Sequence, residues 1–294
     1  MIALDRLPQA NRAIRVEAKT LRFGAMNSPT RDVLVELRSL SSLGFDYVEL
    51  TVEKPKASTE ILRGIRGEII RTVRSLSIEL LGHIPWRFEL GHPYQQFVFP
   101  YHRSIGVAQV HGKQIEEAIE LCHDLGIEKI TVHPPMLTTD TRRAEGRRIL
   151  KQFEEAASIF TSTAKDLGCR VLIENLDEEG FSVQDLEDLF AAVPELGFTL
   201  DVGHANIGKL SNNSLEYLQR FRGRLGHIHI SDNLGGYGDL HLPIGAGGID
   251  FSEILREIRA IGYDETVTVE VFSPDRTYLQ MSREKLAQAL KMID

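Results

Sequence analysis

Short apolar runs alternate with longer segments of helical periodicity along this sequence, and this alternation constrains the fold more than any other feature. In the segment 150–167, for example, Leu150, Phe153, Ala157 and Phe160 are spaced by three or four residues, which places them on one face of a helix. The apolar runs are predicted strands, at residues 21–26, 47–50, 78–83, 129–133, 170–174, 197–201, 225–230 and 267–271. Strands that alternate with helices pair in parallel through right-handed crossovers. Eight such units predict an α/β protein with a closed (β/α)₈ barrel.

The open, doubly wound sheet is the alternative for the same pattern. It is disfavoured because no Gly-x-Gly-x-x-Gly motif follows the first strand. The 294 residues are compatible with one or two domains, and no change of composition marks a linker. We therefore predict an N-terminal leader over residues 1–20 and a single TIM-barrel domain over residues 21–294. The longest connection, from His83 to about Val107, contains Trp86 and is expected to be a lid-like loop.

Composition indicates a soluble globular protein. The formal net charge is −8, which disfavours non-specific attraction to phosphate backbones. The two cysteines, Cys122 and Cys169, lie in apolar patterns and are expected to be buried free thiols. The N-terminus does not resemble a secretory signal, and no segment approaches the roughly 20 apolar residues of a membrane span. We accordingly expect a cytoplasmic protein with no membrane partner.

Charged and imidazole side chains stand at the ends of the predicted strands. In a barrel of this kind the active site lies at the C-terminal ends of the strands, so these residues are expected to converge. From the third strand to the eighth, each run ends in a carboxylate or a histidine, and two more such residues follow the seventh strand: His83, His133, Glu174, Asp201, His204, His229, Asp239, His241 and Glu270. Asp201 and His204 are one turn apart and are expected to face the same ion or two adjacent ions.

This set of residues predicts a site for divalent metal ions. Buried carboxylates are costly unless they are paired or bound to a metal. Imidazole combined with carboxylate suits Zn²⁺, Mn²⁺, Fe²⁺ or Co²⁺ better than Ca²⁺. Asn175 and Asp232 are expected to fix the orientation of ligands through hydrogen bonds, although a plain surface position is an alternative for Asp232. We expect only one of His227 and His229 to face the barrel centre, and we select His229 because it is nearer the strand end. The loop Gly245-Ala246-Gly247-Gly248 either approaches a ligand or is simply flexible.

The order of these residues resembles the xylose isomerase-like TIM-barrel superfamily, over residues 21–294. The resemblance is carried by Glu on the fifth strand, Leu-Asp-x-Gly-His after the sixth, His-x-His-x-x-Asp on the seventh and Glu on the eighth. It implies that Glu174, Asp201, His229 and Glu270 are the four metal ligands shared by sugar isomerases and epimerases. It also implies that His204 acts on substrate oxygens. Members of the superfamily often dimerise, so a homodimer is a further expectation.

Two activities follow from the resemblance. The first is a sugar or sugar-phosphate isomerase or epimerase that uses one to three divalent ions (Mn²⁺, Zn²⁺ or Co²⁺). Glu174 and Glu270 would exchange a proton through an enediolate, or a hydride shift would use the same groups. Trp86 and Asn175 are the predicted substrate contacts. The second activity is that of endonuclease IV, a zinc phosphodiesterase of abasic DNA, because His83, His133, His204, Asp239 and His241 match its additional ligands.

The residues around these positions match neither activity fully. The run Leu176-Asp177-Glu178-Glu179 after the fifth strand differs from the endonuclease IV pattern and is acidic, which suits a DNA groove poorly. On the epimerase side, ketose 3-epimerases carry an arginine several residues beyond the histidine of the seventh strand. Here Leu234-Gly235-Gly236 follows instead.

Overall fold

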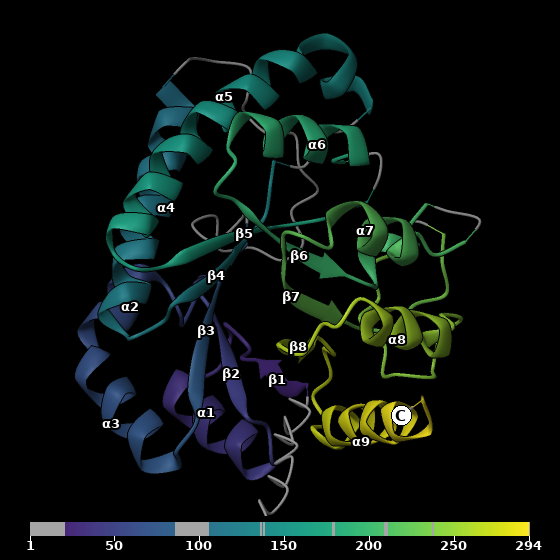
Figure 1. Ribbon diagram of the computed structural model, residues 1–294. Helices are drawn as coiled ribbons and strands as arrows, with labels where there is room; N and C mark the ends of the chain where they lie inside the picture. The colour runs from purple at the N-terminus through teal and green to yellow at the C-terminus, as the bar shows by residue number, and fades with distance from the viewer. Residues whose placement is uncertain are drawn as a thin grey trace, which may run out of the picture.

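The chain forms a closed barrel of eight parallel strands, as predicted, in the order β1 to β8 (Figure 1). This computed structural model describes residues 21–293 except 86–105, 136, 138, 178–179, 209–210 and 237. The predicted leader (1–20) and Trp86 lie outside the described residues. The strands are β1 (Arg22–Met26), β2 (Tyr47–Thr51), β3 (Glu79–Ile84), β4 (Lys129–Val132), β5 (Arg170–Glu174), β6 (Gly197–Asp201), β7 (Leu225–Ile230) and β8 (Thr266–Val269).

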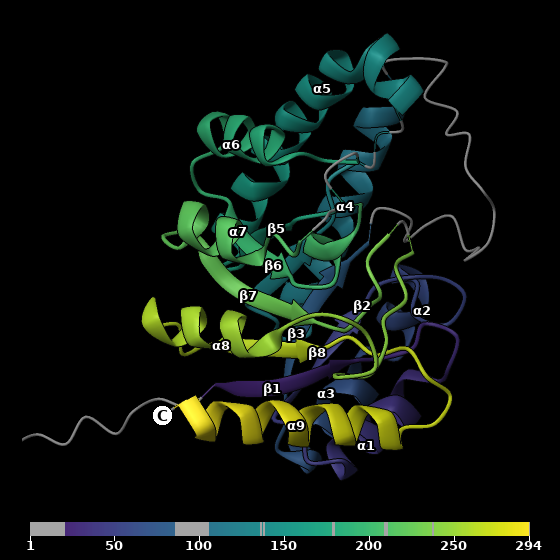
Figure 2. The same ribbon diagram turned by 90° about the vertical axis from the view of Figure 1, so that its right-hand side faces the viewer.

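Helices surround the barrel and connect each strand to the next. They are α1 (Val33–Ser42), α2 (Thr59–Gly64), α3 (Arg66–Leu76), α4 (Gly106–Asp124), α5 (Thr139–Asp166), α6 (Val183–Ala192), α7 (Ser214–Phe221), α8 (Phe251–Ala260) and α9 (Thr277–Ile293), with a short 3₁₀ helix at His204–Asn206. In Figure 2 the strands β1 and β7 point to the right, and the connection from β7 to α8 extends beyond the strand ends on that side. No helix among the described residues is long and apolar enough to cross a membrane.

Strands β2 and β7 present apolar side chains to the helices and polar side chains to the barrel interior. On β7, Ile228 and Ile230 belong to the hydrophobic core, whereas His227 and His229 contact buried polar groups. The same alternation on β2 places Glu49 in the interior, between the core residues Val48 and Leu50. This period of two follows from the pleat of a strand. The polar interior leads to the strand ends, where the predicted site lies.

The two cysteines are buried free thiols, as expected from the apolar patterns around them. Burial raises the pKa of both the Cys122 and the Cys169 thiol. A thiol with a raised pKa is a poor nucleophile and a poor metal ligand at neutral pH. These residues therefore serve packing, and neither thiol is a candidate for nucleophile or ligand.

Candidate metal centre

Four side chains from four strands form the central group of the site. Glu174 ends β5, Asp201 ends β6, His229 lies on β7, and Glu270 follows β8 directly. Each offers one ligand atom, and these atoms all lie within 4.8 Å of one another. All four residues are at most 5% exposed. The parallel barrel produces this convergence because every strand delivers its C-terminal residue to the same rim.

The atoms of the central group are arranged as ligands of an ion rather than as a hydrogen-bond network. Nδ1 of His229 lies 3.3 Å from Oε1 of Glu174, 3.3 Å from Oε2 of Glu270 and 3.8 Å from Oδ2 of Asp201. Ligands bound about 2.1 Å from one tetrahedral ion are about 3.4 Å apart. All four of these atoms are buried and have no hydrogen-bond partner among the described residues. Buried polar atoms are seldom left unpaired, so the group fits a divalent cation.

A second group shares Glu174 with the first. Nε2 of His133 lies 2.9 Å from Oε2 of Glu174, and Nε2 of His83 lies 3.5 Å from the same oxygen. The two Nε2 atoms are themselves 2.9 Å apart. Nδ1 of His83 lies 3.1 Å from the hydroxyl of Thr51, which fixes the orientation of the ring. Histidine ligands typically make a hydrogen bond through one ring nitrogen, which fixes the ring, and use the other nitrogen to bind the ion. The ring of His83 is arranged in this way.

A third group lies at the entrance of the site. Oδ2 of Asp239 is 2.8 Å from Nε2 of His241 and 3.3 Å from Nε2 of His204. The other ring nitrogens contact backbone carbonyls: Nδ1 of His204 lies 3.0 Å from the oxygen of Asn175, and Nδ1 of His241 lies 3.1 Å from that of Glu270. His241 has a φ of +43°, a left-handed conformation that is costly for a residue with a Cβ and is often found at functional sites.

Asp232 holds the loop that carries the third group. Its backbone pairs with Leu242, one residue after His241, through hydrogen bonds of 2.9 and 2.8 Å. Its side chain is fully buried, and Oδ2 accepts hydrogen bonds from the amides of Gly245 and Gly247, both at 2.9 Å. The residue is therefore a positioning residue and not a surface carboxylate. The glycine-rich loop is anchored to it.

Gly247 lies in close contact with the backbone of Asn233 and the side chain of Asp232, and it leaves no room for a larger residue. A Cβ built on it would lie 2.3 Å from the oxygen of Asn233 and 2.4 Å from Oδ1 of Asp232. We expect Gly247→Ala to displace the loop, to cost about 1–3 kcal/mol of unfolding free energy, and to weaken metal binding by the third group. Thermal unfolding and elemental analysis measure the two effects. Gly248→Ala is the matched control, because its Cβ would meet nothing closer than 4.0 Å. Equal behaviour of the two variants would contradict the prediction.

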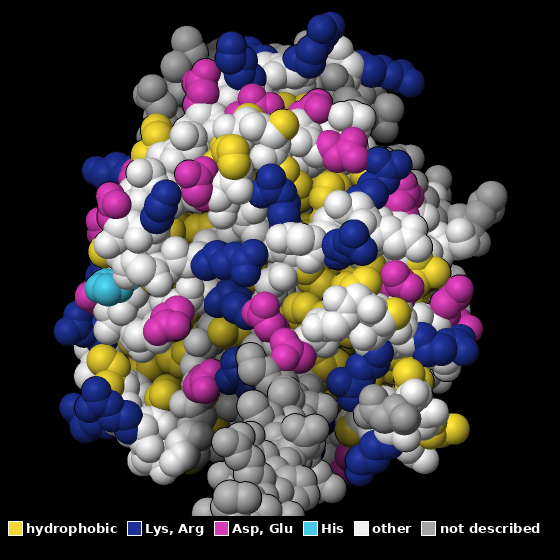
Figure 3. All heavy atoms as spheres, viewed as in Figure 1, with side chains coloured by type: hydrophobic (Ala, Val, Ile, Leu, Met, Phe, Trp, Pro, Cys, Tyr) yellow, Lys and Arg dark blue, Asp and Glu magenta, His cyan; other side chains and the backbone are white. Residues whose placement is uncertain are grey.

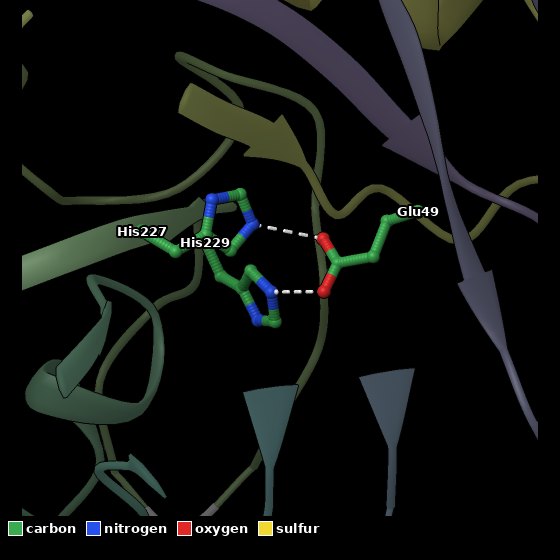
Figure 4. Close-up of side chains that lie close together, drawn as sticks. All are labelled: Glu49, His227 and His229. Carbon is green, nitrogen blue, oxygen red and sulfur yellow. Dashed lines mark hydrogen bonds and ion pairs between the residues drawn. The ribbon is translucent and has the colours of Figure 1, made fainter. Parts of the chain in front are cut away.

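A fourth cluster lies inside the barrel and includes a residue that the sequence reasoning missed. Nε2 of His227 and Nε2 of His229 each lie 2.9 Å from one oxygen of Glu49, whose carboxylate bridges the two rings (Figure 4). All three residues are buried. The expectation that only one of the two histidines faces the barrel centre is wrong, since residues two apart on a strand point to the same face. The same rule applied to β2 would have identified Glu49 as an interior residue.

Charge in the site is balanced between carboxylates and imidazoles. Burial raises the pKa of Asp201 to about 7. Burial alone would also raise the pKa of Glu270, but the imidazoles of His241 and His229 hold it at about 2. Burial would lower the pKa of His241, but Glu270 and Asp239 raise it to about 9. The negative charge of these buried carboxylates thus has to be neutralised, either by protons on the imidazoles and on Asp201 or by metal ions.

An open pocket with a volume of about 660 Å³ leads to these groups. His204, Glu270 and the third-group residues Asp239 and His241 line it. Glu174 is fully buried. The side chain of Asn175 makes two hydrogen bonds with the backbone of Asp201. Its Nδ2 donates to the carbonyl oxygen at 2.9 Å, and its Oδ1 accepts from the amide at 2.8 Å. This is the positioning contact expected of an amide beside a ligand, whereas contact of Asn175 or Trp86 with substrate stays a prediction.

Comparison with known proteins places this arrangement in a family. Residues 37–294 match the family described as xylose isomerase-like TIM barrel. The chain belongs to this family. The resemblance deduced from the strand-end residues is thereby confirmed at the level of the family and of the fold.

Relatives of known sequence or structure are distant. Protein MJ1311 of Methanocaldococcus jannaschii is 30% identical over 193 residues, which cover 60% of this chain and 65% of that protein. L-ribulose-5-phosphate 3-epimerase UlaE of Shigella flexneri is 22% identical over 89% of this chain and 87% of its own length. The crystal structure of a D-tagatose 3-epimerase-like protein has a TM-score of 0.76 at 24% identity, covering 93% of this chain and 98% of that one. At this identity the structural likeness establishes the barrel fold.

The raised pKa values predict that metal binding depends on pH. Metal ligands must be deprotonated, so an ion has to displace the protons held by Asp201 (pKa about 7) and His241 (pKa about 9). We expect affinity for Zn²⁺ or Mn²⁺ to rise between pH 6 and pH 8, by about tenfold per pH unit from His241 over the whole range and from Asp201 below its pKa of about 7. Titration calorimetry in buffers of different ionisation enthalpy measures the protons released. Affinity that does not change with pH, with no proton release, would contradict these ligand assignments.

Proposed function

We propose that this chain is a divalent-metal-dependent epimerase or isomerase of a sugar or sugar phosphate. The observation that carries the proposal is the central group, Glu174, Asp201, His229 and Glu270, whose unpaired ligand atoms meet beside an open pocket. The similarity to L-ribulose-5-phosphate 3-epimerase, which extends over most of both chains, supports it. When bound, a divalent ion supplies Lewis-acid stabilisation of negative charge that develops on substrate oxygens.

The residues that line the pocket are assigned the chemical steps. Glu270 is 5% exposed and faces the pocket with a pKa of about 2, so its carboxylate is ionised and able to take up a proton from a substrate carbon. His204 also lines the pocket, and carboxylates raise its pKa well above the usual value although burial alone would lower it. When the third group holds no ion, a protonated His204 donates a hydrogen bond through Nε2 to the substrate oxygen that gains charge. Glu174 is the predicted second proton-transfer group, and its burial among imidazoles also suits a ligand.

A second candidate is supported by a specific observation, the division of the ligands into three groups. The ligands form three adjacent groups: the second group (His83, His133 and Glu174), the central group, and the third group (His204, Asp239 and His241). This number fits the three-zinc site of endonuclease IV, the alternative that the resemblance implies. The face seen in Figure 3, where basic and acidic side chains are interspersed, lies at the N-terminal ends of the strands, opposite the site. Against the nuclease, the net charge of the chain is −8. A DNA-binding surface is normally a continuous basic area.

Metal analysis combined with two activity assays distinguishes the candidates. The purified protein is analysed for bound Mn, Co and Zn, then incubated separately with L-ribulose 5-phosphate and with a duplex that contains an abasic site. Epimerisation that is lost in Glu270→Gln is the expected result. Strand cleavage that is lost in the same variant, with three zinc ions per chain, would replace the epimerase proposal by the nuclease.

A further inference from the structure

The pocket extends beyond the metal groups to residues that the proposed reaction does not use. Its lining includes Ser28, Thr30 and Arg31 from the segment between β1 and α1, and Ser273 and Arg276 from the segment between β8 and α9. Its volume of about 660 Å³ falls in the range of about 300–1,000 Å³ that is typical of small-molecule sites. The pocket thus has a metal-binding part and a part lined by hydroxyl and guanidinium groups.

A buried carboxylate fixes the two guanidinium groups in this second part. Glu36 on α1 is fully buried, and its Oε1 lies 3.4 Å from Nη1 of Arg31. Its Oε2 accepts hydrogen bonds from Nη2 of Arg276 and from the amide of Ser28. One carboxylate therefore holds two guanidiniums, which leaves a formal excess of one positive charge in this trio. Arg276 is distant from Glu36 in sequence, so the fold has brought the pair together at the pocket.

The guanidinium groups retain hydrogen-bonding capacity after Glu36 is satisfied. A guanidinium has five N–H donors, and Glu36 is contacted through Nη1 of Arg31 and Nη2 of Arg276. Nε of Arg276 is buried and has no hydrogen-bond partner among the described residues. Glu53 also lines the pocket and carries the opposite charge, so the preference for an anion rests on these donors and not on net charge.

We propose that Arg31 and Arg276, with the hydroxyls of Ser28, Thr30 and Ser273, form a subsite for the phosphate group of a phosphorylated sugar. Guanidinium groups bind phosphate oxygens through paired N–H donors, and hydroxyls add further donors. The inference rests on the proposed function, because the metal groups would hold the oxygens of the sugar at the other end of the same pocket. It narrows the substrate class from sugars in general to phosphate monoesters.

The experiment compares Arg31→Gln and Arg276→Gln with a matched control. Arg38→Gln is the control, since Arg38 is exposed on the same helix as Glu36 and does not line the pocket. Binding of inorganic phosphate is measured by calorimetry, and the metal content of each protein is measured in parallel. We expect each pocket variant to bind phosphate about tenfold to a hundredfold more weakly at unchanged metal content, and Arg38→Gln to behave like the wild type.

Kinetics with a phosphorylated and a free sugar provide the second measurement. KM for L-ribulose 5-phosphate should rise about tenfold to a hundredfold in Arg31→Gln and Arg276→Gln. The ratio of kcat/KM for L-ribulose 5-phosphate to kcat/KM for L-ribulose should fall by a similar factor, because L-ribulose has no phosphate group. Arg31→Gln keeps the pair between Glu36 and Arg276, so it preserves the test if Arg276→Gln does not fold.

Three other results would separate the phosphate subsite from the proposed epimerase activity. Phosphate affinity that is equal in the wild type and both pocket variants would overturn the subsite and leave the epimerase proposal standing. Phosphate binding that depends on both arginines, without turnover of any sugar, would support the subsite and remove the epimerase proposal. Cleavage of an abasic duplex with the same dependence on Arg31 and Arg276 would assign the phosphate to DNA and overturn the sugar phosphate.

Discussion

Glu174→Gln is expected to remove metal from two groups at once and to lower turnover by about 10²–10⁴-fold. The reason is that Glu174 is shared: Oε2 lies 2.9 Å from Nε2 of His133, and Oε1 lies 3.3 Å from Nδ1 of His229. Glutamine keeps the shape of the side chain but replaces one oxygen by an amide that donates hydrogen bonds. Such a group repels a cation and cannot bridge two of them.

Elemental analysis, thermal unfolding and the epimerase assay together test this prediction. Glu60→Gln is the matched control, because Glu60 is exposed on α2 and belongs to none of the metal groups. The control should retain both metal and turnover. A folded Glu174→Gln protein with the metal content of the wild type would show that Glu174 is not a ligand. Full metal loss with retained turnover would refute the dependence of the reaction on metal.

The architecture was predictable because its signals are local. Each apolar run and each amphipathic segment is recognised within about ten residues of sequence, and the observed strands differ from the predicted ones only at their ends. The eighth strand, for example, was predicted at 267–271 and spans Thr266–Val269. The convergence of the site was predictable for a related reason. A parallel barrel collects all C-terminal strand ends at one rim, so the identity of the final residues suffices to assemble the site.

Other features of the site depend on contacts that one sequence does not reveal. The pairing of Glu36 with Arg276 joins residues 240 positions apart, and nothing in either neighbourhood indicates the partner. Glu49 is a different case, since the run Tyr47-Val48-Glu49-Leu50-Thr51 carries its own signal, a polar side chain between two core residues. A search of the strand ends alone does not find Glu49, because it lies in the middle of β2. The polar interior of the barrel is therefore encoded by alternation within the strands, and the metal groups by their ends.

Glu49→Ala is expected to lower the free energy of unfolding by about 3–5 kcal/mol, the largest effect on stability that we predict for one residue. The carboxylate is fully buried and bridges His227 and His229 at 2.9 Å each, and it also accepts a hydrogen bond from Thr268. Its removal leaves the buried Nε2–H of His229 without an acceptor and leaves that of His227 only the hydroxyl of Thr268, at 3.1 Å. Denaturant unfolding measures the loss. Thr131→Val is the control for a buried polar group, since it removes the 2.9 Å contact with Thr199 elsewhere in the barrel and should cost about 1 kcal/mol.

Glu49→Gln separates stability from positioning. Nε2 of His229 donates to Glu49, so Nδ1 is the nitrogen that faces Glu174 and Glu270 and binds an ion once its proton is displaced. A glutamine at this position has only one acceptor oxygen. It can therefore accept a hydrogen bond from His227 or from His229, but not from both. We therefore expect this variant to fold and to bind metal at the central group about 10–100-fold more weakly. If Glu49→Gln binds metal as tightly as the wild type while Glu49→Ala is unstable, Glu49 serves the barrel interior alone and has no positioning role at the metal centre.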